Sequence, residues 1–187
     1  MVYFDHDHFA HNLAHTYDLD ESYIYQKKAQ LESISKEFDN AEISPEIFTK
    51  KVSSALNKKF EIAEFRKIWN EIFSENVEVT KILRELKGKV RLLAMSNTNT
   101  WHFDYLEEKF DFLDLFDDHI LSFRLGYSKP DKRIFERAIE LSQESTQILY
   151  FDDIPEYVIE AKKLGISAHQ YTDGDQLRRI LRNARLI

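Results

Sequence analysis

The sequence predicts an α/β protein, with a Rossmann-like parallel sheet sandwiched by helices and a small helical cap domain inserted after the first strand. Residues 8–75 carry apolar positions at helical spacing and no period-two run. From residue 76 onward, short apolar runs alternate with helical segments. All four glycines lie in this second half, so the two halves are built differently. We therefore predict an α/β core of residues 1–7 and 76–187, and a cap of residues 8–75.

The first half reads as a small helical bundle. Ser44 and Pro45 form a helix start, with Ser44 as the N-cap and Pro45 at the first helical position. Apolar side chains recur on one face of each expected helix, namely Phe9, Leu13 and Tyr17, then Ile47, Val52 and Leu56, then Phe65, Ile68, Trp69 and Ile72.

The second half alternates between expected strands and helices. The strands are expected at 90–95, 119–121, 148–151 and 168–171. The helices are expected at 77–86, 101–110, 133–141, 155–164 and 175–184. Because this alternation is typical of βαβ units, it indicates a parallel sheet.

Composition limits the class of function. The 187 residues are 43% hydrophobic, which suffices for one well-buried core with a small appended domain. The net charge of -7 gives no electrostatic reason to bind nucleic acid or an anionic membrane. The absence of cysteine excludes disulfides and thiolate metal sites. No signal-like N-terminus or membrane-length apolar run is present, so we expect a cytoplasmic protein.

Polar residues follow three apolar runs. Each run is followed by hydroxyl, amide or carboxylate side chains: Asp5-His6-Asp7 after 2–4, Ser96-Asn97-Thr98 after 90–95, and Asp152-Asp153 after 148–151. In an open parallel sheet, ligands bind outside the carboxyl ends of the strands. We therefore expect these groups to gather at one edge of the sheet.

Each group has a structural and a functional interpretation. Ser96 to Thr98 are good helix caps, but a hydroxyl beside helix N–H groups also binds anions. Asp152 and Asp153 could cap a helix, yet adjacent carboxylates repel, and Mg²⁺ would explain both. Lys129 precedes Pro130, which reads as the first position of the next helix. A cation there opposes the helix dipole by about 0.3–1 kcal/mol unless an anion binds, and a solvated surface lysine is the alternative interpretation.

The combination of these groups is more specific than any one of them. The order Ser96-Asn97-Thr98, Lys129-Pro130 and Asp152-Asp153 resembles motifs II, III and IV of the haloacid dehalogenase superfamily. The resemblance covers residues 76–175 and is closest to the branch of haloacid dehalogenases and small sugar-phosphate phosphatases. The helical segment before it matches the mobile cap of that family.

The resemblance implies a Mg²⁺-dependent phosphatase of small phosphorylated metabolites that forms an aspartyl-phosphate. Ser96 would hydrogen-bond the phosphoryl group, Asn97 would support that phosphate-binding loop, and Lys129 would neutralise phosphate and nucleophile charge. Asp153, together with Asp152, would hold Mg²⁺. Dehalogenation is the less expected reaction, because it needs no metal and does not explain this carboxylate pair.

Motif I has two alignments. In the first, Asp5 is the nucleophile and a metal ligand, Asp7 is the general acid and base, and residues 1–4 form the central strand. His8 and Phe9 then replace the usual Gly and Thr or Val. In the second, residues 2–9 match the stretch that opens the cap, and motif I lies upstream of Met1. The need to fill the central strand position supports the first alignment, whereas the distance from Asp5 to Ser44 supports the second, so both stay open.

Three further features bear on function. Tyr157 stands where the family often has Asn or Asp, which weakens the support expected around the metal. A family member without motif I would be a non-enzyme that binds a phosphorylated ligand or a protein partner. His8, His11 and His15 fall at helical spacing and could bind Zn²⁺ or Ni²⁺, although a polar helix face that happens to carry histidine is the simpler interpretation.

Overall fold

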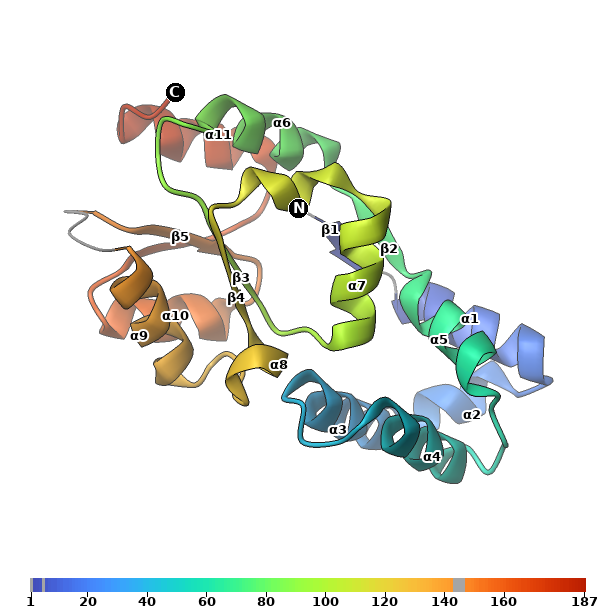
Figure 1. Ribbon diagram of the computed structural model, residues 1–187. Coiled ribbons are helices and arrows are strands. Elements are labelled where there is room, and N and C mark those ends of the chain that lie inside the picture. The colour runs from blue at the N-terminus through green and yellow to red at the C-terminus, as the bar shows by residue number, and fades with distance from the viewer. Residues whose placement is uncertain (1, 5, 143–146) are drawn as a thin grey trace.

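The structure is a computed structural model that describes residues 2–4, 6–142 and 147–187, so Asp5 lies outside the described residues. Figure 1 shows that it has two halves. Helices α1 to α5 form one half, and strands β3 to β6 with their flanking helices form the other. The α/β class predicted from the sequence is confirmed by this arrangement.

The helical half contains five helices among the described residues: α1 (His6–Tyr17), α2 (Glu21–Gln26), α3 (Lys28–Asp39), α4 (Pro45–Ala55) and α5 (Ile62–Asn70). The predicted start of α4 is confirmed, because the Ser44 side chain accepts a hydrogen bond from the Ile47 amide and Pro45 opens the helix. Free N–H groups of a first helical turn need such acceptors, which is why the chain begins a helix here.

An aromatic cluster forms the core of this half. Phe48 is 1% exposed, and its ring lies 4.5 Å from that of Phe38 and 4.9 Å from that of Trp69. The predicted inner face of α5 is confirmed, since Phe65, Ile68 and Trp69 are buried. Apart from Trp101, every buried member of the cluster comes from residues 10–69. The helical half therefore has an apolar core of its own.

The second half is built on parallel strand pairs. Strand β3 (Leu93–Ser96) pairs with β4 (Asp118–Leu121), and β5 (Leu149–Asp152) pairs with β6 (Ser167–Gln170). The intervening helices are α6 (Val77–Leu86), α7 (Thr100–Lys109), η1 (Asp111–Leu115), α8 (Ser122–Leu125), α9 (Lys132–Leu141), α10 (Pro155–Lys163) and α11 (Gly174–Asn183). Each of these strands and helices lies within a few residues of its predicted position, except η1 and α8, for which no element was predicted.

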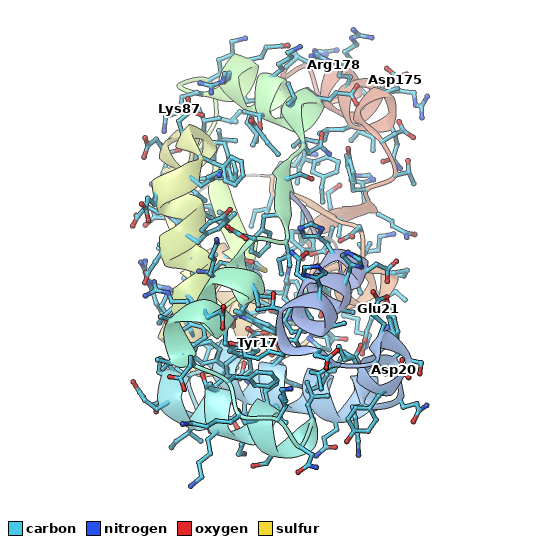
Figure 2. The ribbon with its side chains drawn as sticks, turned by 90° about the vertical axis from the view of Figure 1, so that its right-hand side faces the viewer. Tyr17, Asp20, Glu21, Lys87, Asp175 and Arg178 are labelled. Carbon is cyan, nitrogen blue, oxygen red and sulfur yellow. The ribbon has the colours of Figure 1, made fainter. Side chains whose placement is uncertain are left out.

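Helices cover both faces of these strands. On one face, α6 and α11 lie side by side, and Glu85 and Arg178 join them through an ion pair of 2.8 Å. Figure 2 shows Arg178 and Asp175 at this end of the molecule, opposite the helical half that carries Tyr17 and Asp20. On the other face lie α9 and α10. Among the described helices, none has the length and apolar character needed to cross a membrane.

Strand β1 (Val2–Phe4) departs from the expectation. It pairs antiparallel with β2 (Phe73–Glu75), with Phe4 opposite Phe73, so the prediction that residues 1–4 form a strand of the parallel sheet is wrong. Strand β2 is three residues long, too short to show a period-two pattern in the sequence. The pairing brings the two ends of the helical segment together at residues 4 and 73.

Strands β3 and β5 lie in one layered unit without pairing to each other. Ala94 and Phe151 belong to the apolar cluster under α6 and α11, while Met95 and Tyr150 belong to the cluster under α9 and α10. Each strand has a hydrogen-bonded neighbour on one side only, among the residues described. All four residues of β5 are only half-buried, and a cavity of about 1940 Å³ is lined by both strands.

Candidate functional site

The polar groups predicted at the strand ends do meet. Ser96 ends β3, Asp152 ends β5, and Lys129 enters from the loop between α8 and α9. The Lys129 ammonium donates to Asp152 Oδ2 at 2.6 Å and to the Met95 carbonyl at 3.2 Å. The lysine of predicted motif III thus joins the ends of the strands that carry motifs II and IV.

Lys129 occupies a different place from the one inferred for it. Helix α9 begins at Lys132 with Asp131 as its N-cap, so Pro130 is not its first residue and the helix-dipole argument for Lys129 is wrong. The surface interpretation is wrong as well, because the side chains of Lys129 and Asp152 are each 8% exposed. A buried lysine needs an anionic partner, and Asp152 is that partner here.

Asp152 is fully engaged within the protein. Its Oδ2 accepts from Lys129 and from the Tyr150 hydroxyl at 2.5 Å, and its Oδ1 accepts from the Ile154 amide at 3.0 Å. Asp153 is exposed, and its backbone carbonyl accepts from Gln170 at 3.1 Å. Its carboxylate makes no hydrogen bond or ion pair with the described residues. The two adjacent carboxylates therefore have different surroundings.

These carboxylates offer Mg²⁺ a partial set of protein ligands. Mg²⁺ is commonly held by one or two carboxylates, with water and substrate phosphate completing its octahedron. Asp153 meets that requirement directly, whereas Asp152 is held by Lys129 and Tyr150. Three or more His, Asp or Glu side chains do not come together as a metal-binding group anywhere in the described ranges. The residues fit an ion that shares its coordination with a bound anion.

Two tyrosines enclose the lysine. Tyr157 was expected only as a weaker substitute for Asn or Asp beside the metal, and Tyr150 was not predicted at the site. The Lys129 ammonium lies 5.0 Å from the Tyr157 ring centroid and 6.0 Å from that of Tyr150. Burial, and then the Asp152 charge, raise the pKa of both hydroxyls, so they stay protonated as donors or acceptors. Tyr150 stands two residues before Asp152 in a strand, and that spacing places both side chains on one face.

Asn97 locks the Lys129 loop to the end of β3. Its Oδ1 accepts from the Lys129 amide at 2.8 Å, and its Nδ2 donates to the Lys129 carbonyl at 3.0 Å and to the Tyr157 hydroxyl at 3.2 Å. These contacts use the amide fully, which suits the expected supporting role. Ser96 Oγ has one weak contact, to the Asn97 carbonyl at 3.4 Å, and its hydroxyl is therefore available to a ligand.

The remaining candidate residues are not joined to these strand ends by any described contact. Asp7 is exposed in α1 and accepts from the Tyr25 hydroxyl at 2.8 Å. Asp5 lies outside the described residues. His11 contacts Glu21 at 2.8 Å, and its ring stacks on His15 with centroids 6.5 Å apart. The structure does not bring His8, His11 and His15 together as metal ligands.

Comparison with known proteins identifies relatives. A profile of haloacid dehalogenase-like hydrolases matches residues 6–165. The chain is 26% identical over 157 residues to a D-ribitol-5-phosphate phosphatase of Bacteroides thetaiotaomicron, which covers 79% of this chain and 76% of the relative.

Solved structures with the same fold include two from this family. A magnesium complex of a HAD family enzyme from Bacteroides thetaiotaomicron has a TM-score of 0.83 and 19% identity, over 97% of this chain and 93% of the other. The L-2-haloacid dehalogenase of Xanthobacter autotrophicus has a TM-score of 0.66 and 18% identity, over 98% and 80%. The enzyme from Bacteroides thetaiotaomicron was also solved with magnesium and inorganic phosphate, at a TM-score of 0.79 and 20% identity over 92% and 89%.

Proposed function

Because the chain belongs to the haloacid dehalogenase-like hydrolase family, we propose that it hydrolyses phosphate esters of small metabolites with Mg²⁺ as its cofactor. The observation that carries this proposal is the contact between Lys129 and Asp152 where β3 and β5 end, with Ser96 as the last residue of β3 and Asp153 directly after β5. The relative that acts on D-ribitol 5-phosphate supports a substrate of the polyol-phosphate or sugar-phosphate class.

The described residues divide the work of binding a phosphoryl group. Ser96 would donate its hydroxyl to a phosphoryl oxygen, and Lys129 would stabilise the charge that develops there. Asn97 and Tyr157 would keep the lysine loop in register through the hydrogen bonds given above. Mg²⁺, held by Asp153, would supply further charge neutralisation at the phosphate. An arriving phosphate would compete with Asp152 for Lys129 and free that carboxylate for the metal.

The nucleophile is assigned from the resemblance alone. Asp5 would attack phosphorus, and Asp7 would protonate the leaving oxygen and then activate water. The pairing of β1 with β2, rather than with β3 or β5, agrees better with the alignment in which residues 2–9 open the cap. The activity of Asp5→Asn therefore decides between the two alignments.

A second candidate function is binding without turnover. Among the described residues, β3 and β5 each have a hydrogen-bonded neighbour on one side only, and this favours it, because one more strand would complete the sheet and order the whole anion site. On this interpretation the protein would bind a phosphorylated ligand or a protein partner and hydrolyse nothing. Both candidate functions use the same anion site, but only hydrolysis requires a nucleophile.

Phosphate release from D-ribitol 5-phosphate tests the proposal. The wild-type chain should release phosphate with Mg²⁺ and lose that activity when the metal is chelated. Lys129→Met should abolish turnover, while Lys132→Met, three residues away and exposed, should keep it. Loss of activity in Asp5→Asn would establish the nucleophile. If the wild type binds phosphate but releases none from any ester, the binding function replaces the enzymatic one.

A further inference from the structure

A carboxylate of the helical half contacts the loop that follows β3. Asp39 is the last residue of α3, and its Oδ1 accepts from Asn99 Nδ2 at 2.8 Å. Its backbone carbonyl accepts from Ser122 Oγ at 2.6 Å, and the same Oγ accepts from the Thr98 amide at 2.9 Å. The end of α3 is thus bonded to residues 98 and 99, directly beyond Ser96 and Asn97.

This position is unfavourable for an acid on structural grounds. A carboxylate at a helix C-terminus faces the negative end of the helix dipole. Burial raises the pKa of Asp39 to about 6, against smaller lowering by its hydrogen bonds with Asn99 and Ser35. No cation forms an ion pair with it in the part of the chain that is described. An acid whose pKa is raised by burial, and whose contacts join two parts of the structure, is a candidate functional residue.

Asn99 has one possible orientation, which makes Asp39 its required acceptor. Its Oδ1 caps α7 by accepting from the His102 amide at 3.0 Å, so its amide nitrogen must donate. That nitrogen contacts Asp39 Oδ1 and, at 3.2 Å, His102 Nδ1. Burial lowers the pKa of His102 to about 3, so its ring is neutral. Its Nε2–H then donates to the Trp69 carbonyl at 3.0 Å, and Nδ1 can only accept.

The charged groups on the three elements around Asp39 do not compensate it. Helix α3 carries Lys36, which is exposed. On α7, His102 is neutral and Asp104 is paired with Arg66 at 3.4 Å. On α8, the Arg124 guanidinium lies 4.9 Å from the Phe103 ring centroid. Proton binding to Asp39 is therefore governed by whether its carboxyl is enclosed against Asn99 or exposed to water.

We propose that Asp39 is a positioning residue that clamps the end of α3 onto the Ser96–Asn99 loop, and so couples the position of the helical half to anion binding. The inference rests on the proposed function, because the loop matters only if Ser96 contacts a phosphoryl group. Asp39 touches no reacting atom; it acts through Asn99 and through the backbone that follows Ser96.

The clamp has a defined dependence on pH. An enclosed Asp39 with a pKa of about 6 holds its proton more tightly than an exposed one at 3.8, so closure is strongest when the carboxyl is protonated. Closure weakens as pH rises through about 6 and is constant above that range. Between pH 5 and pH 7 the clamp should open about ten-fold more readily, from the same linkage relation.

Amide hydrogen exchange of Thr98 reports the clamp directly, because this N–H bonds to the Ser122 oxygen that holds α3. After correction for intrinsic exchange, wild-type protection should fall about ten-fold from pH 5 to pH 7. Asp39→Asn keeps an oxygen acceptor for Asn99 but has no carboxyl to titrate. Its Thr98 protection should stay at the level of the wild type at pH 5 and should not depend on pH. Asp39→Ala removes the acceptor and should lower protection at every pH. Asp114→Asn, an exposed acid on η1, should match the wild type.

Titration with inorganic phosphate and Mg²⁺ gives the second readout. At pH 5, Asp39→Ala should bind phosphate about ten-fold more weakly than Asp39→Asn, which should stay close to the wild type at that pH. Thr98 protection that is independent of pH in the wild type, or unchanged in Asp39→Ala, would overturn the clamp. Failure of every variant to bind phosphate, with the Thr98 effects present, would uphold the clamp and refute the proposed function.

Discussion

The apolar core is more completely buried in the helical half of the molecule than at the centre of the sheet half. In the helical half, Phe48, Phe65 and Leu13 are at most 1% exposed, and aromatic rings interlock around them. In the sheet half, the outer helices are equally well packed, yet all of β5 is half-buried and lines a cavity with β3. The helical half therefore has a fully packed core. The polar groups of the candidate site instead lie at the less completely packed centre of the sheet half.

Lys129 shows what the difference means for function. A buried cation inside a closed core would have a structural role alone. Here the ion pair lies at the carboxyl ends of two strands, each of which has a hydrogen-bonded neighbour on one side only among the described residues. A ligand can therefore reach it without breaking a packed core.

The largest effect is expected in the aromatic cluster. Phe48→Ala should lower the free energy of unfolding by about 3–5 kcal/mol, because a fully buried ring is lost and the cavity cannot collapse. Phe151→Ala in β5 should cost less than half as much, since its side chain is only partly buried. Urea denaturation of both variants measures the contrast; equal losses would show that the two halves are packed alike.

The buried ion pair should come next. Lys129→Met leaves Asp152 buried without a cation and should destabilise the protein by about 3 kcal/mol. Adding Asp152→Asn to that variant removes the uncompensated charge and should restore most of the loss. The unfolding free energies of the two single variants and the double variant form the required cycle. An additive result would mean that Lys129 and Asp152 are not coupled.

Asp39 should produce a pH-dependent effect of intermediate size. Its pKa is raised from 3.8 to about 6, so the stability it contributes is complete below pH 3.8 and lost as pH rises through about 6. Asp39→Asn should therefore match the wild type near pH 4 and exceed it above pH 7 by up to about 3 kcal/mol. Thermal unfolding at pH 4, 6 and 8 gives the profile. A constant difference across that range would contradict the raised pKa.

The smallest effect is expected at the surface of the sheet half. Arg84 and Asp111 form an exposed ion pair of 2.8 Å, which solvent screens. Asp111→Asn should leave the urea midpoint within experimental error at physiological salt. A clear shift that persists in 1 M salt would show that this pair has a packing role.

The helical periodicity and the alternation of the second half predicted most of the fold. Helix α6 was predicted to the residue, and β3 to β6 were placed within about three residues, because long periodic runs and buried apolar runs carry strong signals. Strand β1 was assigned to the wrong sheet. Its partner β2 is three residues long, and only tertiary contact between residues 2–4 and 73–75 determines that pairing.

The candidate site was predicted in part. Ser96, Asn97, Lys129 and Asp152 were found from their order along the chain, and the structure brings them together. The partners that surround them were not found, because Tyr150 and Asp39 lie outside the recognised motifs and act through spatial contact. Neither carries a local pattern, apart from the two-residue spacing that puts Tyr150 beside Asp152.

The central claim is that the ends of β3 and β5 form a phosphate site shared with Mg²⁺, and calorimetric titration with inorganic phosphate tests it most directly. We expect Mg²⁺ to tighten phosphate binding to the wild type, Ser96→Ala to weaken it about ten-fold, and Asp153→Asn to remove the Mg²⁺ effect. Asp114→Asn should behave as the wild type. Equal phosphate affinities for the wild type, Ser96→Ala and Asp153→Asn, with no effect of Mg²⁺, would refute a shared phosphate and Mg²⁺ site.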